Sequence, residues 1–427
     1  MSNQNQVSQS SLQMQLTEIF AYLKSQKDDS QGKSQPGQQV INNLEFSVTA
    51  LTFNTDPTKS SQLVVAGENK IQFYDVAFNQ GSQLNSQNAT KTYTYESLKD
   101  DTITAIHFPN TKKEKKNEKY PFFFGTKQGK FLCGMSLNQE QNENQVPHVE
   151  LHQGQISCIL QVQWQEELVL LTGGYDGLIK QFKVNFREGN ENTFEINYFP
   201  FQNDGVLKHG SQEGVFWLSL SEIKENDQKQ KQRLIASGYE NNFYIWERNT
   251  NDFQWHFILK YKRNAFGSRV AYYGSDCIVW QLFQQNYVNI LINLDTSVLN
   301  NKDVALNFKP ENIRKVQLNE KQNDNSIERY DNDKFPLLYH KDKQIMVIKC
   351  GNRIYFLKCK SQLPSREGSQ NIAQLFQAQR ELSFNYYEQY IECSLDCTLG
   401  AISPKGDILV VYDSCKKELK YYRLFFL

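Results

Sequence analysis

Two pairs of residues with possible metal chemistry stand four positions apart in this sequence: His148 with His152, and Cys393 with Cys397. Two histidines at this spacing bind zinc in metalloproteases when they share a helix face and a glutamate follows the first histidine. Here Val149 follows His148 and a strand-like run follows His152, so that pattern fails. The two cysteines have no second Cys or His pair at ligand spacing nearby. We therefore predict structural thiols and no metal site.

Other chemical signatures are also absent from the sequence. The chain contains neither a phosphate-binding Gly-x-x-x-x-Gly-Lys-Ser/Thr sequence nor a Gly-x-Gly-x-x-Gly turn after a strand. It lacks the Gly-x-Ser-x-Gly sequence that presents a nucleophilic serine in many hydrolases. We therefore predict that the protein is not an enzyme, with no catalytic residues and no cofactor.

Composition narrows the class of protein further. The 427 residues carry 47 Lys and Arg against 47 Asp and Glu, for a formal net charge of zero. A neutral chain does not attract a polyanion over its whole surface. Neither a signal peptide nor a run of apolar residues long enough for a membrane helix is visible, so the eight cysteines are predicted to be reduced. The expected location is the cytoplasm or the nucleus.

The elements that would position these residues are clearest between residues 152 and 184. This stretch divides into three short apolar strands, at residues 156–162, 168–172 and 178–184. The turn before the third strand contains Asp176-Gly177, and Asp-Gly is a strong hairpin signal because both residues tolerate positive φ. The stretch is therefore predicted to be a small antiparallel sheet.

The same stretch resembles one blade of a WD-repeat β-propeller. The resemblance rests on His152, Ile156, Thr172-Gly173-Gly174, Asp176-Gly177 and Phe182. Phe182 stands where the family has tryptophan, and the aspartate that normally follows is missing. The resemblance implies that His152 bonds to Thr172 and Asp176 and thereby locks the blade.

Similar groups of strands recur along the chain. The predicted first strands begin near residues 48, 103, 156, 215, 269, 335 and 398. Recurring short strands separated by polar loops are typical of propellers. We predict an all-β fold, a seven-bladed β-propeller over residues 38–427, in which residues 40–46 supply the missing fourth strand of the last blade. Residues 369–382 fit a helix inserted after blade six or that blade's outer strand, and we favour the helix.

The first 37 residues form the second predicted region: a disordered start, a short amphipathic helix and a linker. One face of the helix would carry an apolar stripe of Leu12, Leu16, Ile19, Phe20 and Leu23. A helix of about four turns is marginal alone in water, so the stripe must dock on something. It docks either on the protein's own propeller or on a partner protein.

The resemblance implies a non-enzymatic scaffold that binds other proteins as a subunit of a larger intracellular complex. The alternative is a propeller that binds nucleic acid through the lysine-rich segment at residues 112–119, although a solvated loop explains that segment as well. Salt-dependent binding would distinguish the two functions. No membrane partner is predicted.

Overall fold

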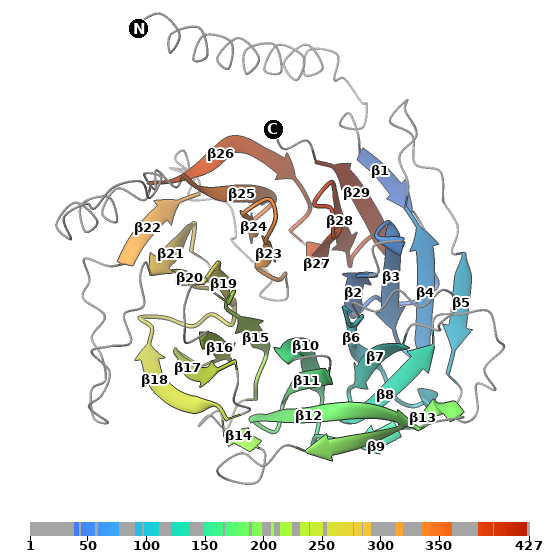
Figure 1. Ribbon diagram of the computed structural model, residues 1–427. Helices are drawn as coiled ribbons and strands as arrows, with labels where there is room; N and C mark the ends of the chain where they lie inside the picture. Colours follow the sequence, from blue (N-terminus) through green and yellow to red (C-terminus); the bar gives the residue numbers. More distant parts are fainter. Residues whose placement is uncertain are drawn as a thin grey trace, which may run out of the picture.

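The computed structural model describes residues 38–41, 44–55, 59–76, 90–95, 98–110, 121–135, 148–164, 167–187, 190–198, 206–208, 214–223, 231–238, 240–250, 254–275, 277–283, 285–291, 313–318, 335–360, 383–395 and 397–424. Within them, strands β1 to β29 form seven antiparallel sheets. The sheets stand around a common centre, each with its first strand innermost (Figure 1). The predicted all-β, seven-bladed propeller is confirmed. The predicted N-terminal helix lies outside the described residues.

The first three blades follow one another without a break in chain order. Blade one consists of β2 (Ala50–Phe53), β3 (Gln62–Gly67), β4 (Lys70–Asp75) and β5 (Lys91–Thr94). Blade two consists of β6 (Ile103–His107), β7 (Pro121–Thr126), β8 (Lys130–Met135) and β9 (His148–Glu150). Blade three consists of β10 (Ile156–Trp164), β11 (Glu167–Gly174), β12 (Leu178–Arg187) and β13 (Asn190–Tyr198), with β14 (Val206–Lys208) also paired to β12.

The next three blades repeat the four-stranded pattern. Blade four consists of β15 (Trp217–Leu220), β16 (Lys231–Ser237), β17 (Asn242–Asn249) and β18 (His256–Lys262). Blade five consists of β19 (Val270–Tyr273), β20 (Cys277–Gln281), β21 (Tyr287–Leu291) and β22 (Ile313–Gln317). Blade six consists of β23 (Leu338–His340), β24 (Ile345–Cys350), β25 (Arg353–Lys360) and β26 (Ser383–Glu392). Its outer strand thus begins just after residues 369–382, which themselves lie outside the described residues.

Blade seven is assembled from both ends of the chain. It combines β27 (Cys397–Ile402), β28 (Ile408–Asp413) and β29 (Glu418–Arg423) with β1 (Gln38–Ile41). β1 lies antiparallel to β29, with Gln38 opposite Tyr422 and Ile41 opposite Leu419. The predicted closure is therefore confirmed, but the strand ends at Ile41 instead of Phe46. The chain must leave the rim there to reach the innermost strand of blade one, and on the way Leu44 and Phe46 fill the core between the two blades.

Continuous apolar runs make these strands because each sheet is covered on both faces. In β24, Ile345, Met346, Val347 and Ile348 are all 0% exposed. Successive side chains in a strand point to opposite faces. Accordingly, Ile345 and Val347 belong to the core shared with blade seven, whereas Met346 and Ile348 belong to the core shared with blade five. Seven such cores, one between each pair of neighbouring blades, hold the ring together.

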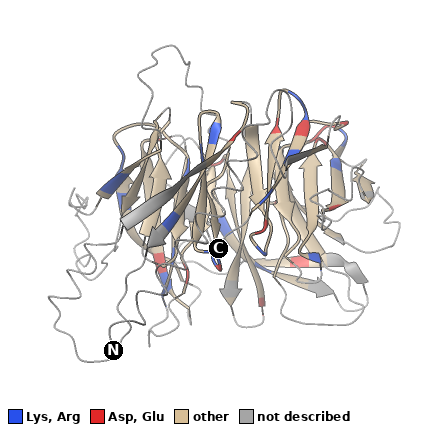
Figure 2. Ribbon diagram, turned by 90° about the horizontal axis from the view of Figure 1, so that it is seen from above, with Lys and Arg blue, Asp and Glu red and all other residues tan. Residues whose placement is uncertain are grey.

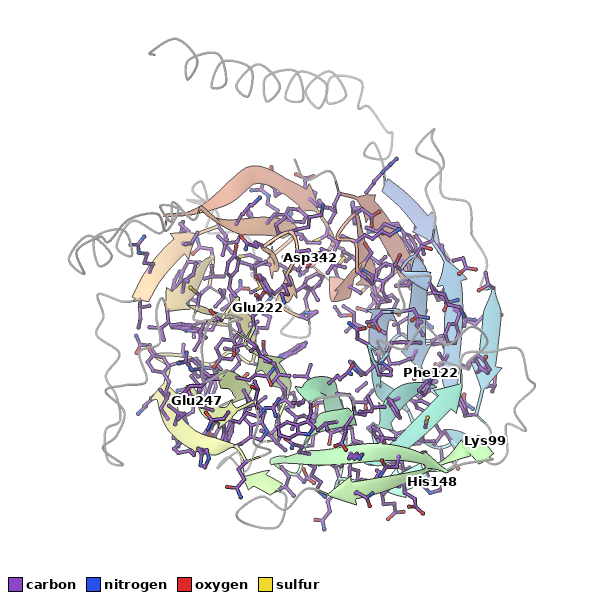
Figure 3. All side chains as sticks on the ribbon, viewed as in Figure 1. Lys99, Phe122, His148, Glu222, Glu247 and Asp342 are labelled. Carbon is purple, nitrogen blue, oxygen red and sulfur yellow. The ribbon has the colours of Figure 1, made fainter. Side chains whose placement is uncertain are left out.

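Aromatic side chains fill much of the core between blades one and two. Phe122 of β7 is fully buried there (Figure 3). Its ring centroid lies 5.6 Å from that of Phe73 in β4 and 5.4 Å from that of Phe108, which follows β6. Aromatic pairs at such distances stabilise a core beyond the area that they bury.

Hydroxyl groups near the start of the innermost strand join one blade to the next. The donor and acceptor pairs are Thr49 Oγ1 to the Ile103 carbonyl, Thr104 Oγ1 to the Ile156 carbonyl, and Ser157 Oγ to the Val215 carbonyl. Register shifts in β6 and β10 occur at Thr104 and Ser157. A bulge re-aims its side chain, which explains how these hydroxyls reach the neighbouring blade.

Candidate functional site

The loops that lead into the innermost strands and the turns between second and third strands lie on the same side of the ring. In blade three the Tyr175 amide donates to the Gln155 carbonyl at 2.9 Å. At the start of blade seven the Cys393 amide donates to the Asn352 carbonyl, in the corresponding turn of blade six, at 2.8 Å. We call this side the His152 face. Figure 2 shows the ring from its edge, with the two faces at opposite ends of the strands.

A buried polar network lies at the edge of blade three on this face. His152, in the loop between β9 and β10, has a side chain that is 0% exposed. Its Nε2 atom lies 2.8 Å from Oγ1 of Thr172 in β11, and its Nδ1 atom lies 2.9 Å from Oδ1 of Asp176 in the β11–β12 turn. Because an ionised carboxylate only accepts hydrogen bonds, Nδ1 is the donor to Asp176.

Asp176 also receives two backbone amides. Its Oδ2 atom accepts from the Gln153 amide at 3.0 Å, and its Oδ1 atom accepts from the Leu178 amide at 3.1 Å. Burial acts to raise the pKa of Asp176, but the hydrogen bond and charge of His152 outweigh it together with the two amides. The pKa therefore lies below the ordinary value of 3.8. The carboxylate is ionised at neutral pH and ties the loop before β10 to the turn after β11.

The order of contacts, hydroxyl to imidazole to carboxylate, is also that of a nucleophilic catalytic triad. A catalytic hydroxyl must reach the substrate. Thr172 is 0% exposed and faces the core of the blade, so this network holds two segments together and has no access to a substrate. We propose it as the lock of blade three.

Phe182 replaces the tryptophan that the WD-repeat resemblance leads one to expect. It lies in β12 and is 0% exposed, with its ring edge-to-face against Phe131 of blade two at 5.1 Å between centroids. Phenylalanine has no N–H group to extend the network. The polar contacts of His152 therefore end at Thr172, and Phe182 contributes apolar packing between the two blades.

The equivalent corner of blade two uses a different residue. In blade two, Oδ1 of Asp101 accepts from the amides of Thr102 at 2.8 Å and Gln128 at 3.1 Å. This carboxylate joins the loop before β6 to the β7–β8 turn, as Asp176 joins the matching segments of blade three. Nothing in the spacing around Asp101 resembles the His152 pattern, so the sequence reading missed it.

Exposed aromatic residues give the His152 face a second feature. Among the described residues, the exposed large hydrophobic side chains are Tyr175 (41%), Phe257 (57%) and Phe266 (61%). Tyr175 occupies the β11–β12 turn, with its ring 4.7 Å from that of Phe216 before β15. Phe266 lies in the loop before β19, and the amide of Phe283 donates to its carbonyl at 2.8 Å. Tyr175 and Phe266 therefore belong to this face, whereas Phe257 lies on β18 at the outer rim.

The sequence analysis does not predict these exposed aromatics. Tyr175 directly precedes Asp176, in a turn whose sequence predicts a hairpin. The sequence signal for an exposed aromatic side chain is its position in a short turn, because loops and turns run over the protein surface.

Several predicted functional residues lie outside the described part of the chain. These include the stripe of Leu12, Leu16, Ile19, Phe20 and Leu23 and the lysine-rich segment at residues 112–119. His148, in contrast, lies in strand β9 and is exposed. Among the described residues, Lys and Arg are interspersed with Asp and Glu along the blades (Figure 2).

The described residues contain no group of three or more His, Cys, Asp and Glu that could hold a metal ion. They also contain no helix long and apolar enough to cross a membrane.

Comparison with known proteins identifies the fold. No family model matches the sequence, and no curated protein matches it either. Among solved structures, the chain is similar to the RRP9 WD40 repeats, with 11% identity, a TM-score of 0.55 and coverage of 91% of this chain and 97% of that one. It is similar to U3-55K with 11% identity, a TM-score of 0.53 and coverage of 91% and 98%.

A chain in the crystal structure of the mitotic checkpoint complex is a further neighbour, with 12% identity, a TM-score of 0.50 and coverage of 91% of this chain and 94% of that one. The chain is thus a seven-bladed β-propeller with a fold similar to that of WD40-repeat proteins. At these identities the likeness concerns the fold.

Proposed function

We propose that the protein is a non-enzymatic scaffold, a subunit of a larger intracellular complex, that binds a partner protein through its His152 face. The observation that carries this proposal is the exposure of Tyr175 and Phe266 on that face. Aromatic residues are enriched at protein interfaces, where they supply much of the binding energy. Loops on a rigid framework are the usual carriers of recognition.

The closed ring supports the same function. Every blade packs against two neighbours, and the pairing of β1 with β29 completes blade seven. A closed ring has no long unpaired sheet edge. The loops of the His152 face are therefore held in fixed positions, which lowers the entropic cost of binding. One of the similar solved structures is named as a complex, the mitotic checkpoint complex, and supports this role by analogy.

Affinity capture from native extract tests the proposal. The full chain is compared with the variants Tyr175→Ser and Phe266→Ser on the His152 face. Phe257→Ser is the matched control, because Phe257 is about as exposed but lies on the rim strand β18. We expect the two face variants to lose the partner proteins and the control to retain them. Loss with Phe257→Ser alone would move the binding surface to the rim.

A fifth protein, which lacks residues 1–30, tests the apolar stripe from Leu12 to Leu23. Loss of the same partners with this folded, shortened chain would make the stripe the docking element. Unchanged partners would leave the His152 face as the binding surface. If none of the five proteins captures anything reproducibly, the scaffold function is wrong.

A further inference from the structure

Aromatic side chains from three neighbouring blades form one connected surface on the His152 face. The ring of Tyr175 in blade three lies 4.7 Å from that of Phe216, in the loop that leads into blade four. The next residue, Trp217, donates from Nε1 to Oγ of Ser268 at 3.2 Å and so reaches the loop before blade five. Phe266 lies in that same loop, two residues before Ser268. We call the following set the aromatic arc: Tyr175, Phe216, Trp217, Phe266 and Phe283.

The aromatic arc is exposed and its loops carry no charge. Tyr175 and Phe266 are 41% and 61% exposed, and the other three members are partly exposed. The segments 214–217, 264–268 and 282–286 contain no Lys, Arg, Asp or Glu. Exposed loop residues of blades one and two on the same face, in contrast, include Glu68, Lys99, Asp100 and Lys127. An occupant of the arc should therefore be apolar and nearly uncharged.

The chain itself contains a segment with these properties. Residues 12–23 carry the apolar stripe of Leu12, Leu16, Ile19, Phe20 and Leu23, and Glu18 is the one charged residue among them. This segment lies outside the described residues. A helix of this length requires an apolar surface to dock on, and two of the three exposed large hydrophobic side chains in the described part of the chain belong to the arc.

The direction of β1 indicates which copy of the arc the stripe can meet. Ile41 lies opposite Leu419, next to the β28–β29 turn on the His152 face, whereas Gln38 lies opposite Tyr422 at the other end of the blade. The chain therefore enters β1 from the side of the ring away from the His152 face, beside blade seven. The arc spans blades three to five on the His152 face, so the stripe and the arc of one copy belong to opposite sides of the ring.

We infer that the apolar stripe of one copy docks on the aromatic arc of a second copy. The inference rests on the proposed function, because it uses the same face and names one occupant of it. A segment from one side of the ring and a surface on the other form a heterologous contact, in which each copy can give one stripe and receive another. The full chain should therefore self-associate, and the shortened chain should not.

A synthetic peptide of residues 8–27 tests the contact directly. Its fluorescence anisotropy is measured with a protein of residues 31–427, which retains every described residue. We expect binding that weakens about tenfold or more in Tyr175→Ser and in Phe266→Ser, as is typical of aromatic residues at the centre of an interface. The control Phe257→Ser, on the rim, should bind as tightly as wild type, and a peptide with Leu16→Ser and Phe20→Ser should not bind. No binding, or equal binding by the two arc variants, would overturn the inference.

Light scattering of the full chain over a range of concentrations tests whether the second copy is the occupant. We expect the average mass to rise with concentration, and the rise to disappear in Phe266→Ser and in the protein that lacks residues 1–30. A full chain that stays monomeric and excludes the peptide would place the stripe on its own propeller and contradict the inference. Each of these failures leaves the proposed function to the capture from extract, which is measured independently.

Discussion

Blades three and seven occupy similar places in the ring but are built in opposite ways. Blade three comes from one continuous stretch of chain, and its corner on the His152 face is joined by His152, Thr172 and Asp176. Blade seven takes three strands from one end of the chain and β1 from the other. Its corner places Cys393, four residues before the first strand residue, at the position that His152 holds in blade three.

The two corners show that the fold determines where the corner lies but not which residue types occupy it. Each corner needs a side chain that ties the incoming loop to the neighbouring turn or strand. In blade three an imidazole and a carboxylate meet this need. In blade seven Cys397 lies opposite Asp413, which forms an ion pair with Lys420. Degenerate repeats of this kind are recognisable by spacing even where the residue types have changed.

The largest expected effect concerns the strand that blade seven borrows. Deletion of residues 1–43 removes β1 and leaves the β29 edge unpaired, whereas deletion of residues 1–37 retains β1. We expect the longer deletion to lower the urea midpoint strongly and to produce oligomers, because an unpaired sheet edge is a template for association. Urea unfolding and size-exclusion chromatography compare the two proteins. Equal stability and equal size would show that β1 does not close the ring.

The second prediction concerns the ion pair between Asp413 and Lys420 in blade seven. Asp413→Ala leaves the largely buried Lys420 without its carboxylate, which should cost about 3 kcal/mol. The double variant Asp413→Leu with Lys420→Met removes both charges and should recover most of that loss, because the apolar pair no longer requires desolvation of ions. Urea unfolding of the wild type, Asp413→Ala and the double variant measures these changes in the free energy of unfolding. If the double variant is as unstable as Asp413→Ala, the ion pair contributes more to stability than the cost of burying its two charges.

In blade three, Asp176→Asn should cost about 1–2 kcal/mol at neutral pH, because the carboxylate loses its charge-assisted bond to His152. The pKa of Asp176 is depressed in the folded protein, so its contribution is present above the unfolded value of 3.8 and is lost as the pH falls through the folded value. The stability difference between wild type and variant should therefore shrink below that pH. Unfolding curves from neutral pH downward measure it, and a constant difference would contradict the assignment.

The smallest expected effect is on the exposed aromatics of the His152 face. Tyr175→Ser and Phe266→Ser should each change the free energy of unfolding by less than about 0.5 kcal/mol, as is usual for surface positions. Thermal and urea unfolding verify this before the binding comparison. A larger loss of stability in either variant would assign that residue to the fold instead of the binding surface.

The sequence was sufficient for the architecture because strands and turns leave local patterns. The run around His152 and Asp176 predicted one blade, and its recurrence predicted the other six. The ends of β1 could not be predicted, because Leu44 and Phe46 are as apolar as Val40 and Ile41 but fill the core between blades seven and one instead of extending the strand. The neighbours of Cys397 could not be predicted either, because its register partner Asp413 and the ion-paired Lys420 come from later strands of the blade.

Hydrogen exchange at β1 tests most directly the central claim that the two ends of the chain close one rigid ring. The amides of Gln39, Val40 and Ile41 are compared by mass spectrometry with those of β29 in the intact protein. If the ring is closed, the two strands should be protected together and should open only with blade seven as a whole. Exchange of the β1 amides at the rate of an unfolded chain, with β29 still protected by β28, would contradict the account.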